Sequence, residues 1–335
     1  MVLDQFKRPL KDLRISVTDK CNFRCPYCMP IEVYGDDYEF SPKAHVLTFE
    51  EITRLAGLFV RLGADKIRLT GGEPLLRKDL PGLVAQLAAL PGLKDLTLTT
   101  NGWFLAEHAK ALKEAGLQRI TVSLDSMDDQ QFGKLNGRGY GVQRVLEGLE
   151  AALAEGLKPL KVNAVIKRGE NEDAILPLAR RFKDTDVVVR YIEYMDVGNR
   201  NGWRMEDVVS AQEIVSMINE EMPLEPVDPG YRGEVAKRYR YRSGKGEIGV
   251  ISSITQPFCG DCTRARLSTD GELLTCLFGH KGTPLRDPMR GGASDDELLG
   301  LIENTWNRRT DRYSEERPWR TSPGNRKIEM YQIGG

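Results

Sequence analysis

The sequence contains only three histidines, His45, His108 and His280, and they stand far apart. No HExxH-type pair is present, which excludes metal ligation by two histidines of one helix turn. The chain also lacks any run of about 18 consecutive apolar residues, so we predict no membrane contact. Its N-terminus, MVLDQFKRPLKDLR, has no apolar core of a secretory signal. We therefore expect a cytoplasmic protein.

An excess of charge is missing as well, because 48 Lys+Arg face 49 Asp+Glu and the formal net charge is −1. This balance argues against a broadly basic surface for nucleic acid. No GxxxxGK[ST] loop of the ATPase type occurs. What is present is 40% apolar residues in 335, enough for a large core and for two domains, or for one α/β domain with an extension. Six cysteines, expected to be reduced in the cytoplasm, are interpreted as ligands or catalysts.

Short β-rich runs alternate with amphipathic helical stretches over the first two thirds of the chain. This alternation favours βα units and a parallel sheet. The predicted strands are Leu13–Val17, Lys66–Thr70, Asp95–Thr99, Arg119–Leu124, Leu160–Ile166 and Val187–Tyr194, and the predicted helices lie near 49–62, 79–89, 104–115, 141–155, 172–182 and 210–221.

Polar residues occupy every second position of these strands, as where Arg14 and Ser16 alternate with Leu13, Ile15 and Val17. Only the sixth strand is judged to alternate poorly. An antiparallel sheet with one solvated face gives the same pattern and stays an alternative. We prefer a curled parallel sheet with helices outside and a polar, ligand-filled interior. Its six strands are fewer than the eight of a complete barrel.

A proline-rich break at 222–230 predicts a domain boundary near 224–232. We expect a barrel over residues 1–223 and a C-terminal α+β extension over 224–335. In the extension, 234–242 and 247–251 predict an antiparallel hairpin, followed by irregular structure and a helix near 295–307.

The first cysteine set, Cys21, Cys25 and Cys28, forms a CxxxCxxC run in the loop after the first strand. A tetrahedral structural zinc needs four ligands. Three thiolates suit a 4Fe–4S cluster with one iron open to an outside ligand, although such clusters usually take four cysteines. Zinc with a fourth ligand from elsewhere and inert thiols remain alternatives.

The second set, Cys259, Cys262 and Cys276, forms CxxC-x13-C, and His280 follows four positions later. Spacing alone therefore permits a Cys₃His zinc site as readily as an iron–sulfur cluster. Arg264 and Arg266 follow Cys262 by two and four positions and lie on one face of an extended segment. Guanidinium groups bind polyphosphate oxygens well, which favours a second open cluster beside an anionic substrate.

Four cations, Arg14, Arg68, Lys161 and Arg190, stand inside the predicted strands. Buried cations without partners are costly, so an anion is expected to compensate them. Internal Asp and Glu partners are one interpretation. A nucleoside triphosphate is the sharper one.

CxxxCxYC after the first strand resembles the motif of the radical S-adenosylmethionine superfamily, and Gly71-Gly72-Glu73-Pro74 resembles its GGEP motif. The stretch 258–271 with Cys276 closely resembles the molybdenum cofactor biosynthesis protein A family, the GTP 3′,8-cyclases. The resemblance covers the whole chain, including 99–102, 123–125, 194–198 and the terminal Gly334-Gly335. It implies a partial TIM-type (βα)6 barrel and two three-cysteine 4Fe–4S clusters, whose open irons bind S-adenosylmethionine and the guanine of GTP.

The resemblance also implies the site residues and the reaction. GTP would be bound by Arg14, Arg68, Thr99, Lys161, Arg264 and Arg266, the last two also being catalytic, with Arg190 a candidate. S-adenosylmethionine would be bound by Tyr27, Gly72, Ser123 and Met195.

A 5′-deoxyadenosyl radical would convert GTP to (8S)-3′,8-cyclo-7,8-dihydroguanosine 5′-triphosphate, the first step of molybdopterin synthesis, and the Gly-Gly tail would reach the active site. An external flavodoxin- or ferredoxin-like electron donor, a downstream pathway enzyme that takes the product, and a homodimer are further expectations. Two alternatives stay open: a related radical enzyme acting on a peptide or another small molecule, and a non-enzymatic, zinc-stabilised scaffold.

Overall fold

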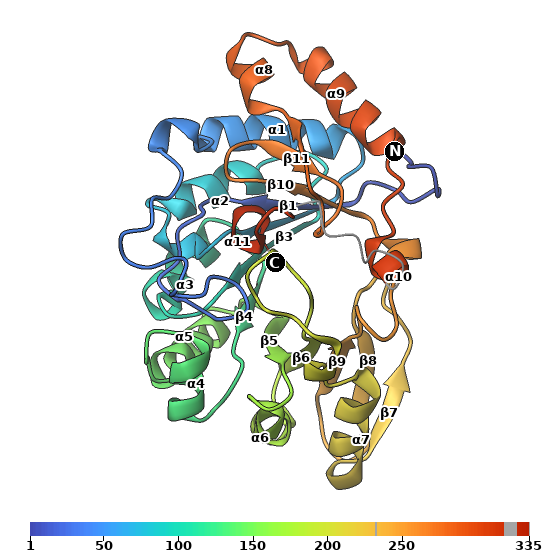
Figure 1. Ribbon diagram of the computed structural model, residues 1–335. Helices are drawn as coiled ribbons and strands as arrows, with labels where there is room; N and C mark the ends of the chain where they lie inside the picture. Colours follow the sequence, from blue (N-terminus) through green and yellow to red (C-terminus); the bar gives the residue numbers. More distant parts are fainter. Residues whose placement is uncertain (232, 318–326, 335) are drawn as a thin grey trace.

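The computed structural model describes residues 1–231, 233–317 and 327–334 (Figure 1). Within these ranges all strands belong to one twelve-stranded sheet, in the order β12-β11-β10-β1-β2-β3-β4-β5-β6-β9-β8-β7. The sheet curls without closing, as expected for an incomplete barrel (Figure 1).

Six parallel strands form the middle of this sheet, and each pairs with the next one along the chain. The antiparallel alternative is therefore wrong. The long helical connections are the physical reason, because a parallel pair needs a crossover of a dozen or more residues. The six strands are β1 (Asp12–Ser16), β2 (Lys66–Thr70), β3 (Asp95–Thr100), β4 (Arg119–Ser123), β5 (Leu160–Ile166) and β6 (Val187–Glu193).

Helices cover the outer face of the curled sheet (Figure 1). The predicted helices are confirmed with ends shifted by a few residues, and the first begins at a capping box formed by Thr48 and Glu51. The helices of the barrel are α1 (Phe49–Arg61), α2 (Leu80–Ala88), α3 (Leu105–Glu114), α4 (Asp129–Leu135), α5 (Gln143–Ala154), α6 (Ile175–Phe182) and α7 (Ala211–Glu221).

The C-terminal segment extends the sheet at both edges. The predicted hairpin is confirmed as β8 (Lys237–Tyr241) and β9 (Glu247–Ile251), with β7 (Leu224–Val227) outside it, and β9 joins β6 in parallel. The expectation of irregular structure beyond the hairpin is wrong for β10 (Arg264–Leu267), β11 (Glu272–Leu274) and β12 (Thr283–Pro284). These strands are short, and β10 forms because it pairs in parallel with β1, far away in sequence.

The described part of the C-terminal segment also contains four α-helices. The predicted helix near 295–307 is confirmed as α9, whereas the others were not predicted. They are α8 (Arg286–Arg290), α9 (Asp295–Asn307), α10 (Tyr313–Glu316) and α11 (Met330–Ile333).

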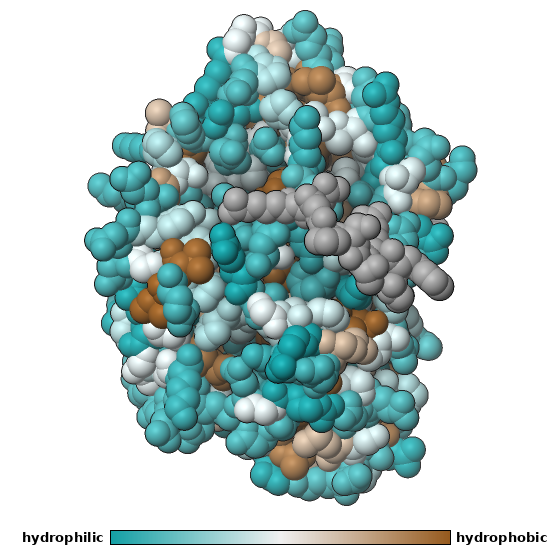
Figure 2. Space-filling model, in the orientation of Figure 1, coloured by the Kyte–Doolittle hydropathy of each residue, from teal (hydrophilic) through white to brown (hydrophobic). Residues whose placement is uncertain are grey.

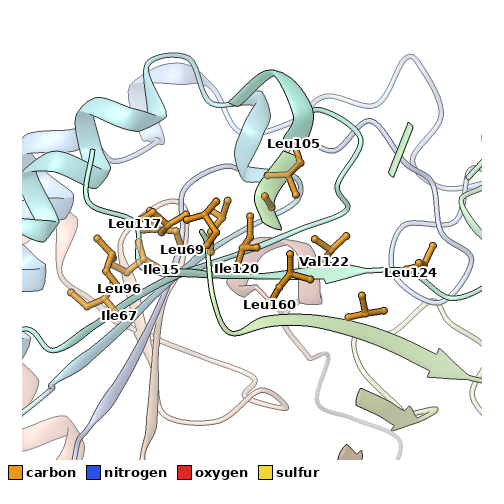
Figure 3. Close-up of a cluster of buried hydrophobic side chains, with 14 of the residues drawn as sticks. Ile15, Ile67, Leu69, Leu96, Leu105, Leu117, Ile120, Val122, Leu124 and Leu160 are labelled. Carbon is orange, nitrogen blue, oxygen red and sulfur yellow. The ribbon is translucent and has the colours of Figure 1, made fainter. Parts of the chain in front are cut away.

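The apolar parity of the strands forms the core between sheet and helices (Figure 3). Leu69, Leu96 and Ile120 point from neighbouring strands into one cluster with helical residues such as Leu105 (Figure 3). The sixth strand alternates poorly in residue type, but burial along β6 nevertheless alternates at every position. Apolar Ile192 shares the cavity face with Arg190, which obscured the pattern in the sequence.

The visible face in Figure 2 is largely hydrophilic, and hydrophobic residues form small separate groups on it. Among the described residues, no helix combines the length and the apolar composition needed to cross a membrane.

The core assignment predicts that Leu69→Ala lowers the free energy of unfolding by about 2–5 kcal/mol, because Leu69 is fully buried and its truncation leaves a cavity. Leu76→Ala is the matched control, since 39% of Leu76 is exposed. Urea denaturation of the metal-free chain measures both, and equal effects of the two substitutions would contradict this placement of the core.

Candidate active site

A cavity of about 300 Å³ lies on the inner face of the curled sheet. All six cysteines line it, although the two sets are more than 230 residues apart in sequence. Every other predicted site residue except Lys161 lines it as well: Arg14, Tyr27, Arg68, Gly72, Thr99, Ser123, Met195, Arg264 and Arg266. The fold therefore brings the two motifs to one space.

The loop after β1 presents the first set. Its turn is closed by the amides of Cys28 and Met29, which donate to the carbonyl of Cys25 over 2.9 and 2.8 Å. Arg24 donates to the carbonyls of Cys21 and Phe23 at 2.7 and 2.8 Å, so a guanidinium holds the loop from inside. Burial, with Glu73 nearby, raises the pKa of Cys21 to about 12. Binding of a metal cluster would therefore release protons.

Two glycines bring the GGEP turn against this loop. The amides of Gly72 and Glu73 donate over 2.7 Å to the carbonyls of Thr18 and Lys20. A Cβ on Gly72 would overlap the backbone of Lys20, so only glycine permits this approach.

Glu73 is buried in the same turn and accepts hydrogen bonds of 2.7 Å from Thr100 Oγ1 and the backbone amide of Asn101. Burial raises its pKa to about 7. Asn101 in turn donates over 2.8 Å to Asn22, beside the first cysteine. Asn101 was not predicted as a site residue, and its place within the Thr99–Gly102 motif was the only available signal.

Tyr27 is fixed by Asp125, whose carboxylate accepts the phenol proton over 2.8 Å. The other oxygen of Asp125 accepts a hydrogen bond of 2.8 Å from the backbone amide of Val165 on β5. Because Asp125 follows β4, it connects the cysteine loop to both strands. Burial raises the pKa of Asp125 to about 6. Met195 lies in the loop after β6 and Ser253 in the loop after β9, and Ser253 Oγ donates to the sulfur of Met195 over 2.7 Å.

In the second set, Cys259 and Cys262 lie at the short helical turn Cys259–Asp261 before β10, and Cys276 follows the end of β11. Burial alone would raise the pKa of Cys262, but the charges of Arg264 and Arg309 outweigh it and lower that pKa to about 6. Burial, with Asp311 nearby, raises the pKa of Cys276 to about 12. His280, the proposed fourth zinc ligand, is not among the described residues that line the cavity.

Three thiols per set are the donor chemistry that an open 4Fe–4S cluster requires, and the six residues fit two such groups. Among residues 1–231, 233–317 and 327–334, no three His, Cys, Asp or Glu side chains gather as ligands of a single metal ion would. A cubane binds each thiolate through a different iron, so its ligands need not meet at one point.

Sheet register aligns three cations across β10, β1 and β2. Arg14 is the register partner of Arg266 on one side and of Arg68 on the other. Neighbouring strands lie about 4.8 Å apart, so this arginine row concentrates charge on the cavity wall. The Nε atoms of Arg14 and Arg68 are buried and have no hydrogen-bond partner. In the part of the chain that the structure describes, the arginine row forms no ion pair with a carboxylate.

The other predicted cations differ in their surroundings. Arg190 lines the cavity and donates over 2.9 Å to Asn163, its register partner on β5. Lys161 is on β5 but is not one of the described cavity-lining residues. Burial and repulsion from Arg190 lower its pKa to about 7.

The C-terminal tail reaches this wall. Arg266 donates to the carbonyl of Gly334, and Gly334 packs against Thr70 with a φ of 70°. A Cβ at Gly334 would overlap Thr70, so the close approach requires glycine. Gly335, the last residue of the predicted tail, lies outside the described residues.

Comparison with known proteins agrees with this geometry. Residues 15–182 match the Radical SAM superfamily, and residues 187–315 match the family Molybdenum Cofactor Synthesis C. The chain is 52% identical to the GTP 3′,8-cyclase of Acidothermus cellulolyticus and 49% identical to that of Staphylococcus saprophyticus, in both cases over 100% of this chain and 99% of the relative.

Its fold is also similar to the crystal structure of Streptococcus suis SuiB bound to S-adenosylmethionine. The TM-score is 0.59 at 16% sequence identity, covering 88% of this chain and 68% of that chain. This likeness supports the fold, whereas the full-length relatives define the family. The chain belongs to the GTP 3′,8-cyclase family of the Radical SAM superfamily.

Proposed function

We propose that this chain is a GTP 3′,8-cyclase that catalyses the first step of molybdenum cofactor biosynthesis. One observation carries the proposal: two separate three-thiol sets share a cavity with an arginine row that forms no ion pair with a carboxylate among the described residues. Asp12, whose charge acts on Arg14 and Arg68, pairs instead with Lys66 over 3.0 Å. An anionic substrate beside two open clusters accounts for both features. The names of the full-length relatives support the same reaction.

The first cysteine set would hold a 4Fe–4S cluster, and Tyr27, Gly72, Ser123 and Met195 would line the S-adenosylmethionine site beside it. When bound, these groups supply the electron transfer and radical chemistry that side chains lack. The chain contributes position, because Asp125 holds Tyr27 and the GGEP backbone packs closely against the cysteine loop.

The second cysteine set would hold the other cluster, next to GTP. Arg14, Arg68, Arg264 and Arg266 would bind the triphosphate, because guanidinium forks match phosphate oxygens. Thr99 already accepts a hydrogen bond of 2.8 Å from Arg68, which orients that guanidinium. Lys161 and Arg190 would add charge, and a bound triphosphate would raise the lowered pKa of Lys161.

The surrounding sheet and the tail would keep water away from the reacting atoms. Gly334 reaches Arg266 directly, so the end of the chain and the triphosphate would share one guanidinium. An external electron donor of the flavodoxin or ferredoxin kind, transfer of the product to the next molybdopterin enzyme, and a homodimer stay predictions.

Anaerobic metal analysis tests the two-cluster assignment. We expect about eight irons and eight sulfides per chain and no zinc, since each 4Fe–4S cluster contributes four of each. We also expect 5′-deoxyadenosine to form from S-adenosylmethionine with reductant only when GTP is present. About four irons with zinc, or cofactor cleavage that ignores GTP, would instead indicate a zinc site or a different substrate.

The arginine row predicts that Arg266→Ala weakens GTP binding by roughly 10–100-fold, because one hydrogen bond to a charged group contributes about 1.5–3 kcal/mol. Equilibrium dialysis with radiolabelled GTP measures this affinity on the reconstituted chain. Arg308→Ala is the control, because Arg308 is exposed and does not line the cavity. Unchanged affinity in Arg266→Ala, with both clusters retained, would refute the role of Arg266.

A further inference from the structure

The two cysteine sets receive different hydrogen bonds at sulfur. Cys262 Sγ lies 3.1 Å from Arg264 Nη2 and 3.2 Å from Arg309 Nη2, so two guanidinium groups donate to it. In the first set, Cys21 Sγ accepts only from the amide of Phe23 at 3.4 Å and the side chain of Asn101 at 3.9 Å, among the described residues. Cys262 therefore accepts hydrogen bonds from two cations, whereas Cys21 accepts from neutral donors, as Cys276 of the second set does from the backbone amide of Phe278.

Arg309 is buried and is held in place by several contacts besides the one to Cys262. Only 4% of it is exposed, and its guanidinium lies over the Trp306 ring at 4.6 Å. It donates to the carbonyl of Cys262 over 2.7 Å, and Asp4 and Asp311 each accept from it at 3.4 Å. Backbone and sulfur of one cysteine are thus held by one fixed side chain.

These contacts distinguish Arg309 from the arginines proposed to bind substrate. All its nitrogens have protein partners, whereas Arg14 and Arg68 each leave a buried Nε unpaired. Arg309 therefore has its donors committed to the protein, as expected of a residue that supports a ligand and not of one that binds GTP.

The N-terminal segment before β1 reinforces the same corner. Arg8, which is fully buried, donates to the carbonyls of Cys259 and Asp311 at 2.7 and 2.8 Å. Its Nε donates to Asp4 over 2.6 Å, and Asp4 also faces Arg309. Asp4 thus joins both arginines that hold the second set.

Two buried carboxylates lie near the first set, where the one guanidinium, Arg24, donates to the backbone carbonyl of Cys21 and not to a sulfur among the described residues. The Asp125 carboxylate is 6% exposed and binds Tyr27, which lies between Cys25 and Cys28. The Glu73 carboxylate is 1% exposed and lies behind Asn101, which bonds Cys21. Hydrogen bonds and charges around the sulfurs set the potential of an iron–sulfur cluster. A cation stabilises the added negative charge of a reduced cluster, and a carboxylate destabilises it.

We propose that Arg309 is a positioning residue. It donates a hydrogen bond to the sulfur of Cys262 and sets the reduction potential of the second cluster above that of the first. The proposal rests on the proposed function, because it requires both clusters. Each reduction adds one electron from an external donor, and no covalent bond forms or breaks. The second cluster is therefore reduced at a potential where the first remains oxidised.

An anaerobic potentiometric titration followed by electron paramagnetic resonance tests this in the full reconstituted chain. Dithionite supplies the electrons, and added S-adenosylmethionine or GTP identifies each signal by perturbing the first or the second cluster. The wild type is expected to show two potentials, with the GTP-sensitive signal at the higher one. Arg309→Met keeps the stem over Trp306 but removes the charge, and should shift only that potential to a more negative value.

Two further variants complete the test. Arg309→Lys retains the charge without the fork and should shift the same potential less. Arg308→Met makes the same change at an exposed neighbouring arginine and should shift neither. If Arg309→Met does not retain eight irons, the wild type and Arg309→Lys decide the matter.

A wild-type second cluster at or below the potential of the first would overturn the inference, and so would unchanged potentials in Arg309→Met or Arg309→Lys with eight irons present. In each case the proposed function would stand, since GTP-dependent cleavage of S-adenosylmethionine is measured separately. A wild type with one cluster would refute both.

Discussion

The burial of mutually repelling cations on one wall of the cavity is the constraint on which the site depends. Register places Arg14, which is half-buried, between the buried Arg68 and Arg266. Burial, followed by repulsion from Arg14, lowers the pKa of Arg68 to about 10 and that of Arg266 well below its usual range. Such an arrangement costs folding free energy and persists only where the surrounding structure compensates for it.

The compensation comes from the opposite face of the same strands. Residues adjacent to the arginines, such as Leu13, Ile15 and Leu69, are fully buried against the helices. Because strand side chains alternate, each cation presented to the cavity is accompanied by neighbours in the core. A bound triphosphate would remove the remaining cost, so substrate binding and stability are expected to be linked.

The unclosed sheet gives this wall its composition. In a complete barrel β1 would pair with a further βα unit. Here β10 occupies that edge and contributes Arg266 and Arg264, which follows Cys262 by two positions. Residues before β1 and after α9 then hold the second cysteine set through Arg8 and Arg309. The second set therefore depends on chain segments from both ends of the protein.

The sequence by itself determined the parallel strands, most of the helices, both cysteine sets and the inward-facing cations, because each is encoded locally by periodicity or spacing. Only the tertiary structure decided that both sets share a cavity, that Arg14 and Arg266 are register partners, and that Arg309 bonds Cys262. These facts depend on pairing β1 with β10 across some 250 residues. No local pattern specifies such a pairing, since β10 has only four residues and is stabilised by the strand beside it.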